Sequence, residues 1–277
     1  MKILTSVVNN PIFIEIQFHT FKKYMKCEYE FIVFNDAKEY SDCTNGGDIT
    51  IKKQIEDICK KLDIQCINVP NFHHVNMGMS QRHGDTFTNH VLKYQLNNPD
   101  KYLLLDSDMF LIDYFDHEEY FKYECRIVLQ SRGTINYISN QVCYLDFTKL
   151  TNTHLLDWNC VPGLDAGGMT KIWLNMQCDN FPSCHDIRWK NEVYQTEKIY
   201  FIKHLWSTTW NKSELPQNLQ NDKLVEFLET DPRNTPNYFC EIYDNKFLHY
   251  RAGSNWNGEG MNLHKQLSEK LKNILLD

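Results

Sequence analysis

The sequence predicts an α/β fold in which a mostly parallel sheet is flanked by helices. Strand-like and helix-like segments alternate through the first 110 residues, which is the pattern of βαβ units. Residues 102–105 are apolar on both faces, as expected for a strand in the middle of such a sheet. The chain has 277 residues, of which 42% are hydrophobic and 23% charged, so it can build one sizeable core.

The first half supplies most of the predicted sheet. Residues 3–8 and 30–34 are rich in β-branched and aromatic side chains and predict two strands, with helical spacing at 12–25 between them. Further along, we expect a helix at 48–62, a strand at 64–69, a polar loop at 71–85, a helix at 86–96 and the strand at 102–105.

The second half is more mixed. The predicted elements are strands at 127–129, 141–147 and 247–250, a glycine-rich turn at 162–168, a helix at 189–205 and a closing amphipathic helix at 261–276. Residues 213–237 are polar and contain prolines, which predicts an exposed insertion.

The net charge and the spacing of the cysteines argue against several classes of protein. A net charge of −7 and a pI near 5.9 argue against a nucleic-acid binder with a broad basic surface. The ten cysteines include no CxxC pair, so neither a zinc knuckle nor a redox pair is predicted. No apolar run is long enough to span a membrane, and the first predicted strand follows Met1 and Lys2 directly, so no signal peptide is expected. We therefore expect a cytoplasmic protein with mostly free cysteines.

Two carboxylates, Asp106 and Asp108, directly follow the strand at 102–105. In open α/β sheets, ligands bind outside the carboxyl ends of the strands. Neighbouring carboxylates repel each other unless a cation lies between or beside them. The pair therefore predicts a site for Mn²⁺ or Mg²⁺ that in turn holds a phosphate. The alternative is two solvated loop aspartates, one of them capping a helix.

Other phosphate-binding and metal-binding motifs are missing from the sequence. There is no GxGxxG or GxxxxGK loop. Phe110 stands where a phosphoaspartate enzyme with a DxDxT motif requires threonine, and too few acidic residues alternate for a calcium loop. A nucleotide bound at this edge would depend on strand-end side chains and a metal ion.

The acidic pair, preceded by a βαβ half without glycine loops, resembles the nucleotide-sugar glycosyltransferases of the GT-A fold. A late stretch is similar to the histidine motif of the retaining branch that includes glycogenin and the lipopolysaccharide galactosyltransferases; it reads His249-Tyr250-Arg251-Ala252-Gly253-Ser254-Asn255-Trp256. It differs from that motif in the position of Gly253, in Asn255 instead of a lysine, and in the missing proline before Trp256. The resemblance implies a single GT-A type, Rossmann-like domain over 1–277, with a nucleotide-binding half at 1–110 and an acceptor-side half at 111–277.

The resemblance also implies roles for individual residues. His249 would be the third metal ligand beside Asp106 and Asp108. Asp165, which lies between glycines, and Glu192 are candidates for a catalytic base. Residues expected near the nucleotide sugar lie at strand ends and in loops: Val7, Val8, Asn9, Asp36, Arg82, Asp85, Ser107, Arg251, Gly253 and Trp256. For Arg82 the alternative is a surface arginine, and for Asp85 it is a helix cap.

The expected function is metal-dependent transfer of a sugar from a nucleoside diphosphate sugar, with UDP as the expected nucleotide, to a hydroxyl acceptor such as a glycan. The histidine motif favours retention of the configuration at the sugar carbon, in which the leaving phosphate accepts the proton of the acceptor hydroxyl. Inversion of that configuration would need Asp165 or Glu192 as the base. One alternative is a sugar-nucleotide nucleotidyltransferase, although residues 8–11 lack the glycine and the cation of its usual loop. The other is a non-catalytic sugar-binding module. No nucleic-acid partner and no membrane-spanning segment are expected, and the sequence does not predict the oligomeric state.

Overall fold

A mixed, mostly parallel sheet forms the centre of the molecule. The structure is a computed structural model that describes residues 1–188, 191–216, 219, 221–256 and 260–277. Within these residues the sheet has seven strands, in the order β3 (Gln65–Asn68), β2 (Glu30–Asn35), β1 (Lys2–Val7), β4 (Lys101–Asp106), β7 (Ile135–Asp146), β6 (Cys125–Arg132) and β8 (Ile199–Phe201). The first four strands are parallel, β7 is antiparallel to β4 and β6, and β8 is parallel to β6. The predicted α/β class is confirmed.

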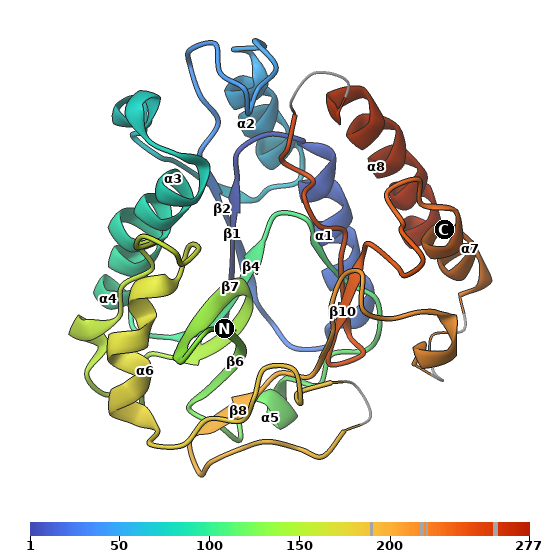
Figure 1. Cartoon of the computed structure of the whole chain (residues 1–277). Helices are drawn as coiled ribbons and strands as arrows, with labels where there is room; N and C mark the ends of the chain where they lie inside the picture. The colour runs from blue at the N-terminus through green and yellow to red at the C-terminus, as the bar shows by residue number, and fades with distance from the viewer. Residues whose placement is uncertain (189–190, 217–218, 220, 257–259) are drawn as a thin grey trace.

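Helices cover both faces of this sheet, as Figure 1 shows. On one face, Ile3 of β1 shares a core with residues of α1 (Ile12–Tyr24) and α2 (Ile51–Lys61). On the other face, Leu4 shares a core with the π-helical segment η2 (Phe87–Leu92) and with α6 (Lys171–Gln177). The alternation of Ile3 and Leu4 between two cores is the period-2 pattern of a strand buried on both sides.

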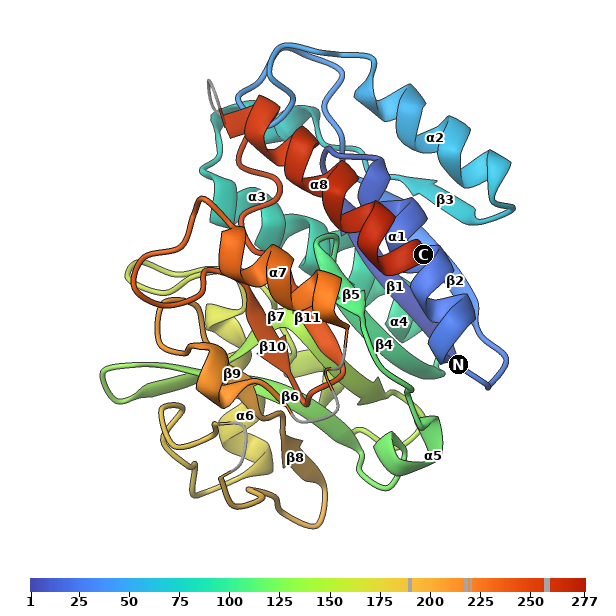
Figure 2. The same ribbon diagram turned by 90° about the vertical axis from the view of Figure 1, so that its right-hand side faces the viewer.

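A second, smaller sheet carries the C-terminal part of the chain beside the first (Figure 2). Its order is β5 (Met109–Leu111), β11 (Phe247–His249), β10 (Glu241–Tyr243) and β9 (His204–Leu205), and all of its pairs are antiparallel. The helices α7 (Asp222–Thr230) and α8 (Gly260–Leu276) pack with this sheet and α1 in a third apolar core. Because β5 directly follows β4, the chain passes from one sheet to the other at the acidic pair.

One more long helical run, formed by three consecutive segments, corrects a prediction. Residues 71–85 were expected to be a loop, but α3 (Met79–Thr86) begins within them and continues through η2 into α4 (Lys93–Asn97). Because α3 contains few apolar residues, the hydrophobic pattern did not predict a helix there. The inner side of α3 faces the cleft described below. The short segments are η1 (Phe72–Asn76), α5 (His117–Tyr120), η3 (Thr153–Leu155), η4 (Gly168–Thr170) and η5 (Lys212–Glu214).

Two further predictions for the second half are wrong. The helix expected at 189–205 is instead extended chain that includes β8 and β9, since Ile199 and Phe201 alternate with Tyr200 in burial; residues 189 and 190 lie outside the described part. The insertion expected at 213–237 contains α7, which buries Leu224 and Phe227 against the third core. No helix in the described part of the chain is long and apolar enough to cross a membrane.

Candidate metal centre and cleft

The acidic pair lies in a tight connection between the two sheets. β4 is buried from Tyr102 to Leu105 and ends at Asp106, and β5 begins at Met109. The buried side chain of Gln17, on α1, donates to the backbone carbonyls of Asp106 (2.9 Å) and Met109 (3.0 Å). Both bonds satisfy backbone carbonyls that flank the connection between β4 and β5. Gln17 thus holds the backbone that presents the carboxylates.

Strand register brings His249 to this connection. β11 pairs with β5 so that His249 is opposite Met109, and the Tyr250 amide donates to the Asp108 carbonyl at 2.9 Å. The His249 Nε2 atom lies 3.2 Å from the Asp108 Oδ1 atom. One potential ligand atom from each of Asp106, Asp108 and His249 lies within 4.8 Å of the other two. The three residues named from the sequence as metal ligands therefore meet at one point.

The second imidazole nitrogen of His249 is held by Glu241, its cross-strand neighbour on β10. The distance between His249 Nδ1 and Glu241 Oε2 is 2.8 Å, and the Tyr243 hydroxyl donates to the same oxygen at 2.7 Å. Metal-bound histidines usually have the other ring nitrogen on a carboxylate or a carbonyl, which fixes the tautomer. Glu241 therefore leaves Nε2 directed at Asp108 as a ligand atom.

The charges of this cluster are strongly coupled. Burial alone would lower the pKa of His249, but the carboxylates of Asp108 and Glu241 outweigh it and raise that pKa to about 10. Burial likewise opposes the charge on Asp108 and on Glu241, and interaction with His249 lowers the pKa of both. Without a metal ion, a proton on His249 neutralises part of the buried negative charge. A divalent cation would take the place of that proton.

The two aspartates differ in their surroundings. Asp108 is buried, and its Oδ2 atom accepts from the Gly253 amide at 2.9 Å. Asp106 is more open to the cleft, and its Oδ1 atom accepts from the Asn140 amide at 2.9 Å and lies 3.3 Å from His83 Nε2. A neighbouring donor therefore orients each carboxylate: the Gly253 amide for Asp108 and the Asn140 amide for Asp106.

A cleft of about 530 Å³ opens over the three candidate ligands. It is large enough for a nucleotide-sized ligand. The residues predicted from the sequence that line it are Val8, Asp36, Arg82, Asp106, Ser107, Asp108, Asp165, His249 and Arg251. Arg251 adopts a left-handed φ of +62°, and its guanidinium donates to the Ser207 hydroxyl at 2.9 Å on the cleft wall.

Arg82 and Asp165 are in the cleft but already have partners. The Arg82 guanidinium forms an ion pair with Asp42 and donates through Nε to the Met77 carbonyl at 2.8 Å. Asp165 is exposed and accepts a hydrogen bond from the Ser80 hydroxyl. Both side chains come from loops or helix starts beside the cleft, so they face the space next to the metal centre rather than the centre itself.

Six other predicted residues do not line the cleft. Val7 and Trp256 are buried in the core, and Glu192 is exposed elsewhere. Gly253 acts through its backbone, as described above. The Asn9 amide donates to the carbonyls of Thr44 (2.7 Å) and Ser254 (3.0 Å), so it joins two loops. Asp85 accepts hydrogen bonds from residues of η1 and η2 outside the cleft.

Sequence reasoning missed several groups at the site. Glu241 and Asn140 contact the candidate ligands, and Lys38 lies beside the cleft. For Glu241 the signal was available in principle, because it lies eight residues before His249 across a hairpin of two short strands. Asn140 lies on β7, whose antiparallel pairing beside β4 no local pattern predicts.

No family model matches the chain, and no curated protein sequence matches it significantly.

Proposed function

We propose that the protein is a metal-dependent glycosyltransferase that moves a sugar from a nucleoside diphosphate sugar to a hydroxyl group of an acceptor such as a glycan. The observation that carries the proposal is the meeting of Asp106, Asp108 and His249 at the floor of a cleft, with Glu241 behind the histidine. Two carboxylates and one imidazole form a donor set that suits Mn²⁺ or Mg²⁺. The arrangement of side chains therefore fits the ion that the sequence resemblance implies.

The leaving group of such a reaction is a nucleoside diphosphate that gains negative charge as the bond to the sugar breaks. A bound Mn²⁺ or Mg²⁺ ion supplies charge neutralisation and a fixed geometry for the two phosphates. The chain adds Arg251 at the cleft wall, a cation whose side chain is 42% exposed. Its hydrogen bond to Ser207 and its ion pair with Glu241 hold the guanidinium on the cleft wall, where it can bind a phosphate oxygen.

Asp165 and Trp206 lie in the cleft where the transferred sugar and the acceptor would bind. Trp206 stacks on His204, with ring centroids 4.1 Å apart, which presents a rigid aromatic face for a sugar ring. If the reaction inverts the sugar carbon, Asp165 accepts the acceptor proton; if it retains, Asp165 orients the sugar. Glu192 lies outside the cleft and has no part in the proposal.

Slow donor hydrolysis tests the proposal without knowledge of the acceptor. The protein is incubated with Mn²⁺ and a panel of UDP-, GDP- and ADP-sugars, and release of the nucleoside diphosphate is measured. We expect release from one donor class, its loss with EDTA, and a decrease of at least about 100-fold in Asp108→Asn, because a metal ligand is removed. Asp57→Asn, on the exposed side of α2, is the matched control and should keep the wild-type rate.

The outcomes separate the alternatives. A nucleotidyltransferase would instead release pyrophosphate from a nucleoside triphosphate and a sugar phosphate. A sugar-binding module would bind sugar equally well as wild type and as Asp106→Asn, without turnover. Absence of hydrolysis for every donor, together with absence of Mn²⁺-dependent UDP binding, would contradict the proposal.

A further inference from the structure

The chain turns sharply after β11, with two successive non-glycine residues in the left-handed region. Arg251 has a φ of +62° and Ala252 a φ of +58°. A Cβ atom makes this region unfavourable, so such residues persist only where the surrounding structure holds them. The Tyr250 amide before the turn donates to the Asp108 carbonyl, and the Gly253 amide after it donates to the Asp108 carboxylate, both at 2.9 Å. The position of Asp108 therefore depends on the shape of this turn.

A nearly buried guanidinium that does not line the cleft holds the turn. Arg233, in the loop after α7, donates from Nη1 to the Arg251 carbonyl at 2.8 Å. That carbonyl belongs to the peptide between Arg251 and Ala252, so its direction constrains the ψ angle of the first residue and the φ angle of the second. The hydrogen bond therefore acts directly on the left-handed pair.

Arg233 is itself fixed by its surroundings. Its Nε atom donates to Asp231 Oδ1 at 2.9 Å, and its guanidinium lies 3.9 Å from the centre of the Tyr250 ring and 4.7 Å from that of Phe239. Only 9% of the Arg233 side chain and 1% of the Asp231 side chain are exposed. A guanidinium held by a carboxylate and by aromatic rings has little freedom to move. Arg233 is therefore a rigid support for the Arg251 carbonyl.

The two ends of Arg251 are held in different places. Its carbonyl is directed at Arg233, whereas its guanidinium is on the cleft wall, where Nη1 donates to the Ser207 hydroxyl at 2.9 Å. The Nε atom of the same side chain lies 3.7 Å from Glu241 Oε1. Rotation of the peptide that Arg233 holds would therefore displace the side chain of Arg251 from the cleft wall.

We propose that Arg233 is a positioning residue for the binding of a metal–diphosphate complex. It acts through the peptide between Arg251 and Ala252. That peptide places the Arg251 guanidinium at the phosphates and the Gly253 amide on Asp108. The proposal rests on the proposed function, because it requires that Arg251 bind a phosphate oxygen. Without Arg233, the turn would exchange its left-handed shape for shapes in which these two groups are misplaced.

Arg233→Lys separates the contact with the turn from the neutralisation of Asp231. The lysine side chain ends one atom short of Nη1, so its ammonium still reaches Asp231 but not the Arg251 carbonyl. Calorimetric titration with UDP in Mn²⁺ should give an affinity about tenfold lower than that of wild type, the effect of one lost charge-assisted hydrogen bond. Asp231→Asn combined with Arg233→Gln, which removes both charges together, is a second variant with the same expected loss. Urea denaturation of each preparation checks that the variant is folded during the titration.

Ala252→Gly supplies a readout that a merely structural role of Arg233 would not move. Glycine adopts the left-handed region without the steric cost of a Cβ atom, so the turn no longer depends on Arg233. Ala252→Gly alone, and Ala252→Gly added to Arg233→Lys, should both bind UDP within about threefold of wild type. Asn152→Gly is the matched control, since Asn152 has a φ of +55° but is exposed and outside the cleft. Added to Arg233→Lys, it should restore no affinity.

The outcomes distinguish this proposal from the proposed function. If Arg233→Lys binds UDP as tightly as wild type, or if Ala252→Gly fails to restore its affinity, the positioning role of Arg233 is overturned. Binding of UDP by the wild type in Mn²⁺ keeps the glycosyltransferase proposal intact in either case. Failure of the wild type to bind UDP in Mn²⁺ would instead overturn both proposals.

Discussion

At the residue scale, the candidate site depends on what surrounds each ligand more than on the ligands themselves. Asp106 and Asp108 are visible in the sequence, because a strand buried on both faces ends at them. His249 was found from its resemblance to a motif. Glu241, which holds the second ring nitrogen of the histidine, can be identified only once the pairing of β10 with β11 across their short hairpin is known.

The first prediction concerns Glu241. Glu241→Gln keeps the size of the side chain but removes the charge that orients and polarises His249, so we expect Mn²⁺ affinity to decrease by about 10- to 100-fold. Direct titration of Mn²⁺, followed by calorimetry or by electron paramagnetic resonance of the free ion, measures it. The exposed Glu226→Gln on α7 is the control. Unchanged affinity in Glu241→Gln would show that His249 is not a ligand.

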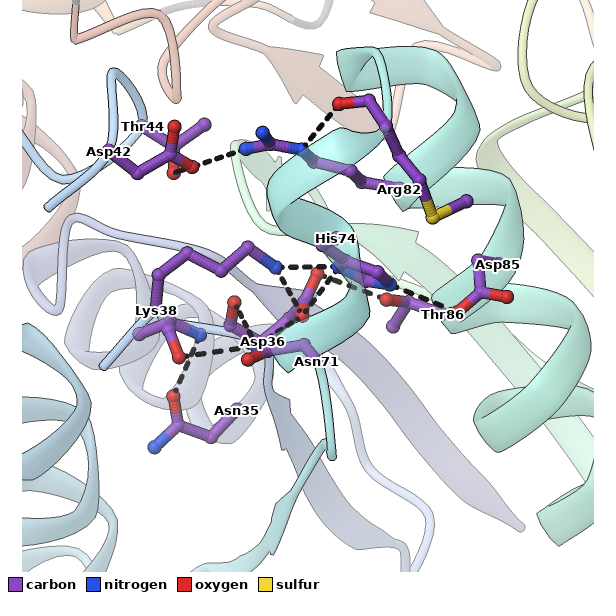
Figure 3. Close-up of polar contacts among 12 residues, drawn as sticks. Asn35, Asp36, Lys38, Asp42, Thr44, Asn71, His74, Arg82, Asp85 and Thr86 are labelled. Atoms are coloured by element: carbon purple, nitrogen blue, oxygen red, sulfur yellow. Dashed lines mark hydrogen bonds and ion pairs between the residues drawn. The ribbon is translucent and has the colours of Figure 1, made fainter. Parts of the chain in front are cut away.

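The contacts of Lys38 are a second feature of the cleft that the sequence alone does not predict. Asp36 is two residues away along the chain, but only the fold brings His74 and Asp85 around Lys38 (Figure 3). Asp36 lies at the end of a strand beside the cleft, as expected, but its other partners, Asn71 before η1 and Thr86 of α3, are distant in sequence. A buried polar network of this kind follows from tertiary packing, and spacing along the chain does not reveal it.

At the scale of elements, hydrophobic periodicity was sufficient for the strands and helices that pack on both sides of the sheet. It was insufficient where elements are short or polar. β8 and β9 have three and two residues, too few to show alternation, and the surrounding polar residues suggested a helix instead. In α7 the buried positions 224, 227 and 228 have helical spacing, but the polar and proline-containing flanks obscured it.

The second prediction concerns the connection after β11, where Gly253 packs without space for a side chain. A Cβ atom at this position would lie 2.5 Å from Phe13 and 3.1 Å from Asp108 Oδ2. Phe13 is fully buried and packs on Phe110, so it cannot move aside. We expect Gly253→Ala to destabilise the protein by about 1–3 kcal/mol through overpacking. It should also weaken Mn²⁺ binding, because the amide that holds Asp108 shifts.

Urea denaturation and Mn²⁺ titration measure the two effects. Gly78→Ala is a suitable control, since that glycine has a φ of −67° and a Cβ there would meet Gln81 at 3.4 Å, an ordinary contact. If Gly253→Ala had the stability and metal affinity of the control, the connection would be looser than its contacts indicate.

At the scale of the whole molecule, the candidate metal centre joins two sheets. Asp106 ends the central strand of the large sheet, and His249 ends β11 of the small one. An ion bound by both would stabilise the folded chain only while the sheets stay together. Binding should therefore appear as a gain in global stability, which rises with free metal concentration by mass action.

The third prediction is that this gain depends on pH. His249 in the metal-free fold has its pKa raised to about 10, against about 6.5 in the unfolded chain. Its protonation therefore stabilises the metal-free protein fully below about pH 6.5, and this contribution is lost as the pH rises toward 10. Metal binding has the opposite trend: the ion must displace the proton, so its affinity should increase about tenfold for each pH unit between 6 and 8.

Thermal denaturation in EDTA and in a fixed Mn²⁺ concentration, at pH 6, 7 and 8, measures both trends. The increase in Tm on adding Mn²⁺ should be larger at pH 8 than at pH 6 and absent in Asp108→Asn, whereas Asp57→Asn should behave as wild type. A shift that is independent of pH, or that persists in Asp108→Asn, would place the ion elsewhere in the molecule.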